Sequence, residues 1–397
     1  MDLSYSEKYA KFRDEVRAFI SQHGHSAPPP LGGRAPGFDD LEWQRRLVEA
    51  GFVGRTVPKE YGGFGAMPDV MEKRIIGEEF SRAGVNQGLT NQGVLMLVPT
   101  LLAHGSEEQK HRWIRPSLLG QTLWCQGYSE PGAGSDLASL QTFAVEDGDD
   151  FIINGQKIWT SSAHFADMIF CLVRTEPDQP KHLGISYLIF PMHLPGIDVR
   201  PLKTMTGEAE FNEVFFTDVR VPKCEVVGQR GQGWIVANST LKHERGSFGD
   251  PGMLAARYKR LEQLFEREAV SGRRLRNDPV LVDRLMQLQG QTLALQFNAM
   301  RVMTCDANEE DPGLAALITK LQACELTHQI QALGIDALGE IGLCYGEGEH
   351  VREEGFWQGR YMLDLGLIIG GGTEQIQRNI IAERGLGMPR EPKLAGR

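Results

Sequence analysis

The chain has 397 residues, of which 41% are hydrophobic and 24% charged, a composition typical of globular proteins. Its net charge of −10 argues against a nucleic acid or an anionic membrane surface as the main partner. No apolar run approaches the ~18–20 residues that a membrane span needs, and the charged N-terminus lacks an apolar signal core. We therefore expect a cytoplasmic protein of two or three domains. Its six cysteines are far apart and lack metal-binding spacing, which predicts reduced thiols and no metal site.

The N-terminal region, residues 1–121, has apolar residues at helical spacing. A Pro/Gly-rich segment, 26–37, interrupts the helical pattern. The next helix is expected to use Asp39 or Asp40 as its N-cap and to end before Gly51. Further helices are expected around 67–82, 91–105 and 106–117.

The middle region, residues 122–230, has the character of β-structure. Segment 142–161 predicts two strands around a tight turn, and Asn154–Gly155 gives a second turn signal. No helix of a dozen residues separates the strand-like segments, which argues against a parallel Rossmann sheet and favours an antiparallel barrel or sandwich. The other segments with strand-like composition are 168–175, 185–192, 197–202 and 211–222.

The C-terminal region, residues 231–397, returns to long amphipathic segments whose lengths suit a helix bundle. The chain is therefore predicted to be an α+β multidomain protein in which a β-domain lies between two helical domains.

A glycine-rich turn, EPGAGSD, follows the strand-like segment WCQGYS in the middle region. Gly132 and Gly134 would allow a ligand to approach the backbone closely, and Ser129 and Ser135 offer hydroxyl groups beside them. The alternative is a plain β-turn in which Ser135 or Asp136 caps a helix. The turn matches neither the Rossmann fingerprint nor the Walker loop.

The segment GYSEPGAGSDLAS (127–139) resembles the signature of the acyl-CoA dehydrogenase family, and NGQKIWTSSA (154–163) is similar to that family's flavin strand. Other family-like motifs follow in the family's order, so the resemblance covers nearly the whole chain. It implies an N-terminal α-helical domain (1–121), a middle antiparallel β-domain (122–230) and a C-terminal four-helix bundle (231–397).

The resemblance also implies FAD as the cofactor. Ser129 matches the residue that bonds the flavin ring, and main-chain groups of Gln126 and Tyr128 lie on the same strand. Trp159 and Ser161 match the aromatic residue and the hydroxyl that flank the isoalloxazine. From the residues alone, Trp159 could instead be a core aromatic of a strand.

Further site residues are implied by the same resemblance. Ser135 matches a position near the CoA pantetheine or phosphate, and Thr373 and Gln375 match positions that contact FAD. Ile335 replaces a family glycine, so FAD contacts from a neighbouring subunit are expected to be altered. The residues that match those cross-subunit contacts are Arg273, Gln331 and Gly334.

The family reaction needs a carboxylate that removes the α-proton of the substrate. Many members carry it in a Glu-Gly-Thr triplet, but here Gly371 occupies that position and retains only the N–H that polarises the thioester carbonyl. The nearby Glu374 is not assigned this role. A subset of the family carries the base on an earlier helix, where Glu244 matches it and Arg245 matches a substrate-binding arginine. The alternative is that both are surface charges at a helix end.

The resemblance implies that the chain oxidises an acyl-CoA thioester to a 2,3-enoyl-CoA and passes electrons to an electron-transfer flavoprotein. A homotetramer or homodimer is expected, with a heterotetramer as an alternative. Two other functions stay open: a flavin oxidase or monooxygenase, and an FAD-poor partner subunit of a hetero-oligomer.

Overall fold

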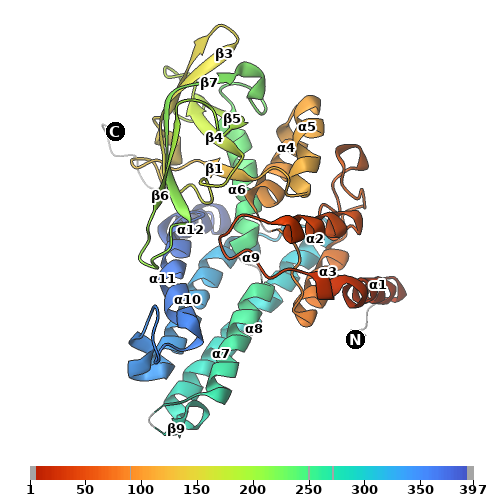
Figure 1. Ribbon diagram of the computed structural model, residues 1–397, viewed down its shortest axis with the longest axis vertical. Helices are drawn as coiled ribbons and strands as arrows, with labels where there is room; N and C mark the ends of the chain where they lie inside the picture. The colour runs from red at the N-terminus through yellow and green to blue at the C-terminus, as the bar shows by residue number, and fades with distance from the viewer. Residues whose placement is uncertain (1–5, 90, 249–250, 271, 391–397) are drawn as a thin grey trace. The chain divides into compact units, whose positions relative to one another are not determined.

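The fold is that of a computed structural model, which describes residues 6–89, 91–248, 251–270 and 272–390, without the side chains of residues 244–248, 251, 269, 270 and 273. The chain forms two compact units, Met1–Glu244 and Arg245–Arg397 (Figure 1). Helices, then strands, then helices follow one another along the chain, which confirms the predicted fold class.

Three helices begin the first unit: α1 (Glu7–His23), α2 (Phe38–Glu49) and α3 (Val70–Ala83). Their apolar faces meet in a core that contains Trp43 and Phe80. The predicted N-cap of α2 is wrong, because Gly37 occupies that position. Asp40 instead lies inside the first turn, where its carboxylate accepts the Gly37 N–H at 2.7 Å.

A second group of helices leads to the sheet. A π-helical turn, Gly93–Leu97, runs into α4 (Val98–His104), and α5 (Glu107–Leu118) follows. Ser106 and Gln109 cap α5 reciprocally, with N···O distances of 3.1 and 3.2 Å.

The middle of the chain forms one seven-stranded sheet in the order β1-β4-β2-β3-β7-β6, with β5 also paired to β4. Most neighbours are antiparallel, as predicted, but β4 pairs in parallel with both β1 and β2. The strands are β1 (Trp124–Gly127), β2 (Phe143–Asp147), β3 (Asp150–Lys157), β4 (Met168–Arg174), β5 (Ile185–Pro191), β6 (Ile197–Leu202) and β7 (Phe211–Pro222).

Asn154–Gly155 is not a turn, contrary to the prediction. Both residues lie within β3, where the pairing with β7 shifts register between Ile153 and Gly155. A Cβ at Gly155 would come within 2.6 Å of the Thr142 Cα, so this close approach of two backbones requires glycine.

Helix α6 (Gly233–Phe248) follows the sheet. Val236, Ala237 and Thr240 on it are buried, and the Thr240 hydroxyl lies 2.9 Å from that of Thr100 on α4. The buried face of α6 is thus fixed against the helices of the first unit.

The described residues of the second unit form four long helices, α7, α8, α10 and α11, which confirms the predicted bundle. Buried residues such as Leu261, Ile330 and Trp357 form its core. Its elements are α7 (Pro251–Arg267), the short strands β8 (Ala269–Val270) and β9 (Arg273–Arg274), α8 (Pro279–Ala307), α9 (Leu314–Leu317), α10 (Thr319–Leu338), α11 (Phe356–Ile369) and α12 (Glu374–Ile380). The domain boundaries drawn from the sequence stay predictions.

Candidate active site

Two segments that carry predicted flavin contacts are neighbours in the first unit. Ser129 follows β1, and Trp159 follows β3. The Ile158 N–H donates to the Ser129 carbonyl oxygen at 2.9 Å, so one main-chain hydrogen bond joins the segments. The Ser129 and Ser161 side chains are both half-buried.

Trp159 is 58% exposed and adopts a left-handed backbone conformation with φ of 60°. The alternative of a core aromatic is therefore wrong. A bulky residue with positive φ is strained, and such strain persists only where neighbours enforce it. The Phe211 ring contacts the indole edge-on at 5.9 Å between centroids. The indole is thus available as an apolar wall for a planar ligand.

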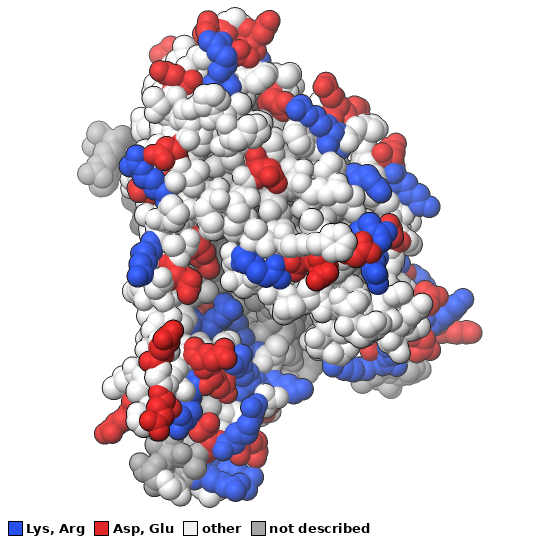
Figure 2. Space-filling model, in the orientation of Figure 1, with Lys and Arg blue, Asp and Glu red and all other residues white. Residues whose placement is uncertain are grey.

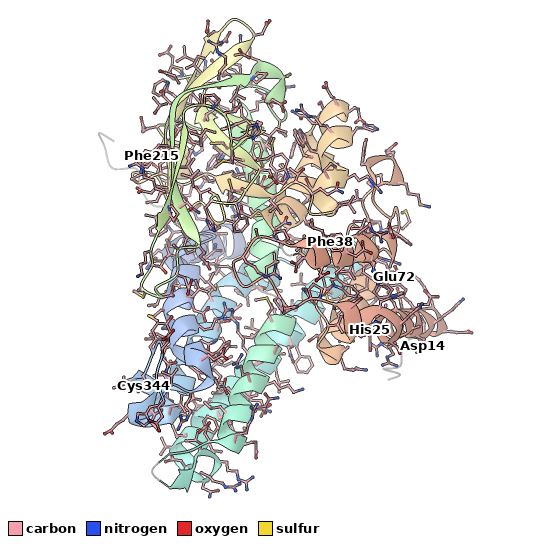
Figure 3. The ribbon with its side chains drawn as sticks, viewed as in Figure 1. Asp14, His25, Phe38, Glu72, Phe215 and Cys344 are labelled. Carbon is pink, nitrogen blue, oxygen red and sulfur yellow. The ribbon has the colours of Figure 1, made fainter. Side chains whose placement is uncertain are left out.

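Asn212 on β7 forms two hydrogen bonds with Thr160, the residue that follows Trp159. Asn212 is fully buried. Its side-chain amide donates to the Thr160 carbonyl oxygen at 2.9 Å, and the main-chain carbonyl oxygen of Asn212 accepts the Thr160 N–H at 3.0 Å. The Thr160 hydroxyl and the Asn212 side-chain oxygen are buried without a hydrogen-bond partner among the described residues. Phe215, labelled in Figure 3, lies three residues further along β7, opposite Gln156 of β3.

Tyr128 is 4% exposed, and its ring packs edge-on against Phe170 and Tyr187. Its side chain belongs to the core, which is compatible with the prediction that its main chain and that of Gln126 serve the cofactor. Gln126 is paired in parallel with Phe170 of β4.

A buried ion pair lies beside these segments. The Lys157 ammonium is fully buried and lies 2.8 Å from a Glu130 carboxylate oxygen. Burial alone would raise the pKa of Glu130, but the Lys157 ammonium, the Thr142 side chain and the Gln141 N–H outweigh it and lower that pKa below its usual value.

Lys157 and Asn212 were missed by the sequence reasoning, although a signal existed. On β3, Phe151, Ile153 and Lys157 occupy the buried phase of the strand, and Asn212 shares the buried phase of β7 with Val214. A polar residue in the apolar phase of a strand needs a specific partner.

The glycine-rich turn after Ser129 is open to solvent. Gly132 and Gly134 are exposed, and a Cβ at either would meet no atom within 4 Å. No internal packing requires these glycines. Ser135 is also exposed, and Asp136 pairs with Lys181 at 2.7 Å instead of capping a helix with its side chain.

In the second unit, the glycine segment after α11 is held by two side chains. The Lys320 ammonium donates to the Gly372 carbonyl oxygen at 2.8 Å, and the Gln377 amide donates to the Gly371 carbonyl oxygen at 3.1 Å. Thr373 caps α12, with its hydroxyl oxygen accepting the Ile376 N–H at 3.3 Å. Gln375 is exposed.

Two of the residues predicted to contact FAD in a neighbouring subunit, Gln331 and Gly334, are packed inside the second unit. Gln331 is fully buried, and both polar atoms of its side chain lack a partner among the described residues. A Cβ on Gly334 would come within 2.4 Å of the Trp357 ring, so this glycine lets α10 pack closely on α11. The cross-subunit role of both stays a prediction.

The side chains of Glu244, Arg245 and Arg273 lie outside the described residues. The backbone of Glu244 and Arg245 belongs to α6, and that of Arg273 belongs to β9.

Other classes of site find no support in the described part of the chain. It contains no group of three or more His, Cys, Asp or Glu residues that could hold a metal ion. Within the same residues, no helix is long and apolar enough to cross a bilayer. Lys and Arg are interspersed with Asp and Glu on the face in Figure 2, unlike the basic stripe of a nucleic-acid-binding surface.

Family models for three domains match the chain: "Acyl-CoA dehydrogenase, N-terminal domain" over residues 6–121, "middle domain" over 125–219, and "C-terminal domain" over 231–386. The acyl-CoA dehydrogenase IpdE1 of Mycobacterium tuberculosis is 39% identical, over 96% of this chain and 98% of its own length.

Solved structures are similar as well. The "Tcur3481-Tcur3483 steroid ACAD" superimposes with a TM-score of 0.83 and 31% identity, covering 98% of this chain and 100% of the other. The ChsE4-ChsE5 complex from Mycobacterium tuberculosis gives a TM-score of 0.81 and 30% identity, with coverage of 98% and 100%.

Proposed function

Because the chain belongs to the acyl-CoA dehydrogenase family, we propose that it binds FAD and oxidises an acyl-CoA thioester to a 2,3-enoyl-CoA. The observation that carries the proposal is the exposed, strained Trp159 joined to the Ser129 segment. A planar apolar wall beside hydroxyl donors fits the chemistry of a flavin ring.

The residues proposed to hold FAD do so through three kinds of contact. The hydroxyls of Ser129 and Ser161 donate hydrogen bonds, Trp159 covers the ring, and main-chain groups of Gln126 and Tyr128 complete the ring site. Further contacts are proposed for Thr373 and Gln375 and, from a neighbouring subunit, for Arg273, Gln331 and Gly334. When bound, FAD supplies the acceptor for the hydride that leaves the substrate β-carbon.

Glu244 is proposed as the base. Position 244 lies seven residues after Ala237 and four after Thr240, and this spacing recurs on one face of a helix. Ala237 and Thr240 are themselves buried, and the assignment of the base rests on the match of Glu244 to the family position. The bond between the α-carbon of the substrate and its hydrogen breaks, and the proton passes to Glu244. The electron pair of that bond forms the double bond between the α- and β-carbons as the hydride leaves the β-carbon.

Two further residues are proposed to act on the thioester. The Gly371 N–H would stabilise the charge that develops on the thioester oxygen, and Arg245 would support binding of the substrate. Ser135, exposed at the glycine-rich turn, is proposed to contact the CoA moiety.

The acyl group is proposed to be bulky and polycyclic. This rests on the 31% identity to a protein described as a steroid acyl-CoA dehydrogenase. The electron acceptor proposed is an electron-transfer flavoprotein, as the family resemblance implies. Reduced flavin that reoxidises slowly in air would support this acceptor, whereas fast reoxidation would point to an oxidase.

A second candidate is a subunit of a mixed oligomer that holds little FAD alone. The similarity to the ChsE4-ChsE5 complex and the substitution of Ile335 for a family glycine favour it. The FAD content of the chain purified alone separates the candidates: one FAD per chain supports a homotetramer or homodimer, and half or less supports the mixed oligomer.

The function is tested by anaerobic titration with a panel of acyl-CoA thioesters that includes short, branched, long and steroid-derived chains. Loss of oxidised-flavin absorbance with one class identifies the substrate. A chain that binds FAD fully but is reduced by none of them contradicts the proposal.

A further inference from the structure

We propose that the buried ion pair between Lys157 and Glu130 positions the two flavin-facing segments, and that both residues are positioning residues of the cofactor site. The inference rests on the proposed function where it assigns Ser129 and Trp159 to the flavin. The pair itself is defined by contacts within the first unit alone.

The Lys157 ammonium bonds to residues on both sides of Ser129. It donates to the Tyr128 carbonyl oxygen at 3.1 Å and to the Glu130 carboxylate at 2.8 Å. Lys157 also lies two residues before Trp159 in the chain. One buried charge therefore connects the segment of the predicted flavin donor with the segment of the predicted aromatic wall.

The Glu130 carboxylate extends this connection to the two residues just before β2. Its two oxygens accept the N–H groups of Gln141 at 2.6 Å and of Thr142 at 2.9 Å. The Thr142 hydroxyl in turn donates to the Gln156 carbonyl oxygen at 3.3 Å, next to Lys157. Hydrogen bonds therefore join Lys157 to Glu130, Glu130 to Thr142, and Thr142 back to Gln156 beside Lys157. Together these contacts restrain the turn after Ser129 relative to β3.

The energetics of buried pairs indicate a positional role. Removing two charges from water costs about as much as their attraction returns, so a buried pair adds little net stability compared with apolar residues of similar volume. Loss of one partner is harmful because it leaves the other charge uncompensated. A variant that replaces both partners therefore separates the effect of the pair on the position of the two segments from its effect on the folding stability of the protein.

Four variants test the proposal: Lys157→Met, Glu130→Gln, the double variant, and Lys223→Met as a control. Lys223 pairs with Glu146 at 2.6 Å in the same domain, but both side chains are substantially exposed. Three quantities are measured for each: the urea unfolding midpoint of the apoprotein, amide hydrogen exchange of peptides covering 128–130 and 158–160, and the dissociation constant of FAD on reconstitution.

The single variants are expected to unfold at lower urea concentration, and the double variant to recover most of that loss. The double variant should nevertheless exchange the Ile158 amide faster, because the hydrogen bond to Ser129 opens more often, and bind FAD about tenfold more weakly. The control should match wild type in all three measurements.

Wild-type exchange at Ile158 together with wild-type FAD affinity in the double variant overturns the proposal. If wild-type protein itself takes up no FAD, the proposed function fails, while the exchange comparison still decides whether the pair positions the segments. Should the double variant not fold, Glu130→Asp keeps the charge and shortens the reach of the carboxylate. Faster exchange at Ile158 is expected there, and unchanged exchange overturns the proposal.

Discussion

The ammonium of Lys320 on α10 donates to the carbonyl oxygens of Ile368 at 3.1 Å and of Gly372 at 2.8 Å. Lys320 is 4% exposed. Because α11 ends at Ile369, the charge lies at the C-terminal end of a helix, where a cation is favourable. The contact also restrains the glycine segment that contains Gly371, the proposed main-chain donor to the thioester.

Lys320→Met should lower the free energy of unfolding by about 1–3 kcal/mol, because it leaves carbonyl groups without their charged donor. Urea unfolding of the purified protein measures this. Lys259→Met is the control, since Lys259 is exposed on α7. Equal unfolding free energies of the two variants would show that the hydrogen bonds of Lys320 do not stabilise the fold.

Gly334→Ala tests the close packing of α10 on α11. The added methyl group would meet the Trp357 ring at 2.4 Å, so we expect a loss of about 1–3 kcal/mol in unfolding free energy. Gly132→Ala adds the same methyl group where no atom lies within 4 Å and should change stability by less than about 0.5 kcal/mol. The packing account fails if both variants unfold alike.

Trp159→Ala should separate cofactor binding from folding. The indole is 58% exposed, so its removal should change unfolding free energy by less than about 1 kcal/mol. FAD affinity should fall at least about tenfold, because the ring loses its wall. Fluorescence quenching on reconstitution measures the affinity. Unchanged affinity would remove Trp159 from the site.

Acid stability provides a test of Glu130. Its pKa in the folded state is lowered, so it contributes stability above its usual pKa of 4.5, and that contribution disappears as the pH falls through the folded-state value. Wild type should therefore lose more stability than Glu130→Gln as the pH falls below about 4.5. Urea midpoints measured from about pH 7 to about pH 3 give both curves. Parallel curves would mean that Glu130 does not carry this linkage.

The sequence predicts the order of helices and strands because hydrophobic period and turn residues are local signals. It fails where a distant contact decides the outcome. Asn154–Gly155 has turn chemistry, yet pairing with β7 and the approach of Thr142 keep it inside β3. The parallel pairing of β1 with β4 likewise joins strands separated by two others in sequence.

In the candidate site, too, local motifs could be predicted from the sequence and distant contacts could not. Ser129 and Trp159 follow from motif resemblance, but the hydrogen bond that joins their segments belongs to Ile158, a residue with no chemical signature. Lys157 carries a weak signal, a charge on the buried phase of a strand. Its partner Glu130 could not be named from spacing, because the contact spans a turn and two strands.

The most direct test of the central claim is anaerobic flavin reduction by Glu244→Gln, with the thioester that reduces wild type. The variant should bind FAD normally and show almost no loss of oxidised-flavin absorbance, because no carboxylate remains to take the α-proton. Glu374→Gln, which changes a glutamate paired with Arg378 on α12, is the matched control and should be reduced like wild type. Reduction of Glu244→Gln at the wild-type rate, or loss of reduction in Glu374→Gln alone, would contradict the account.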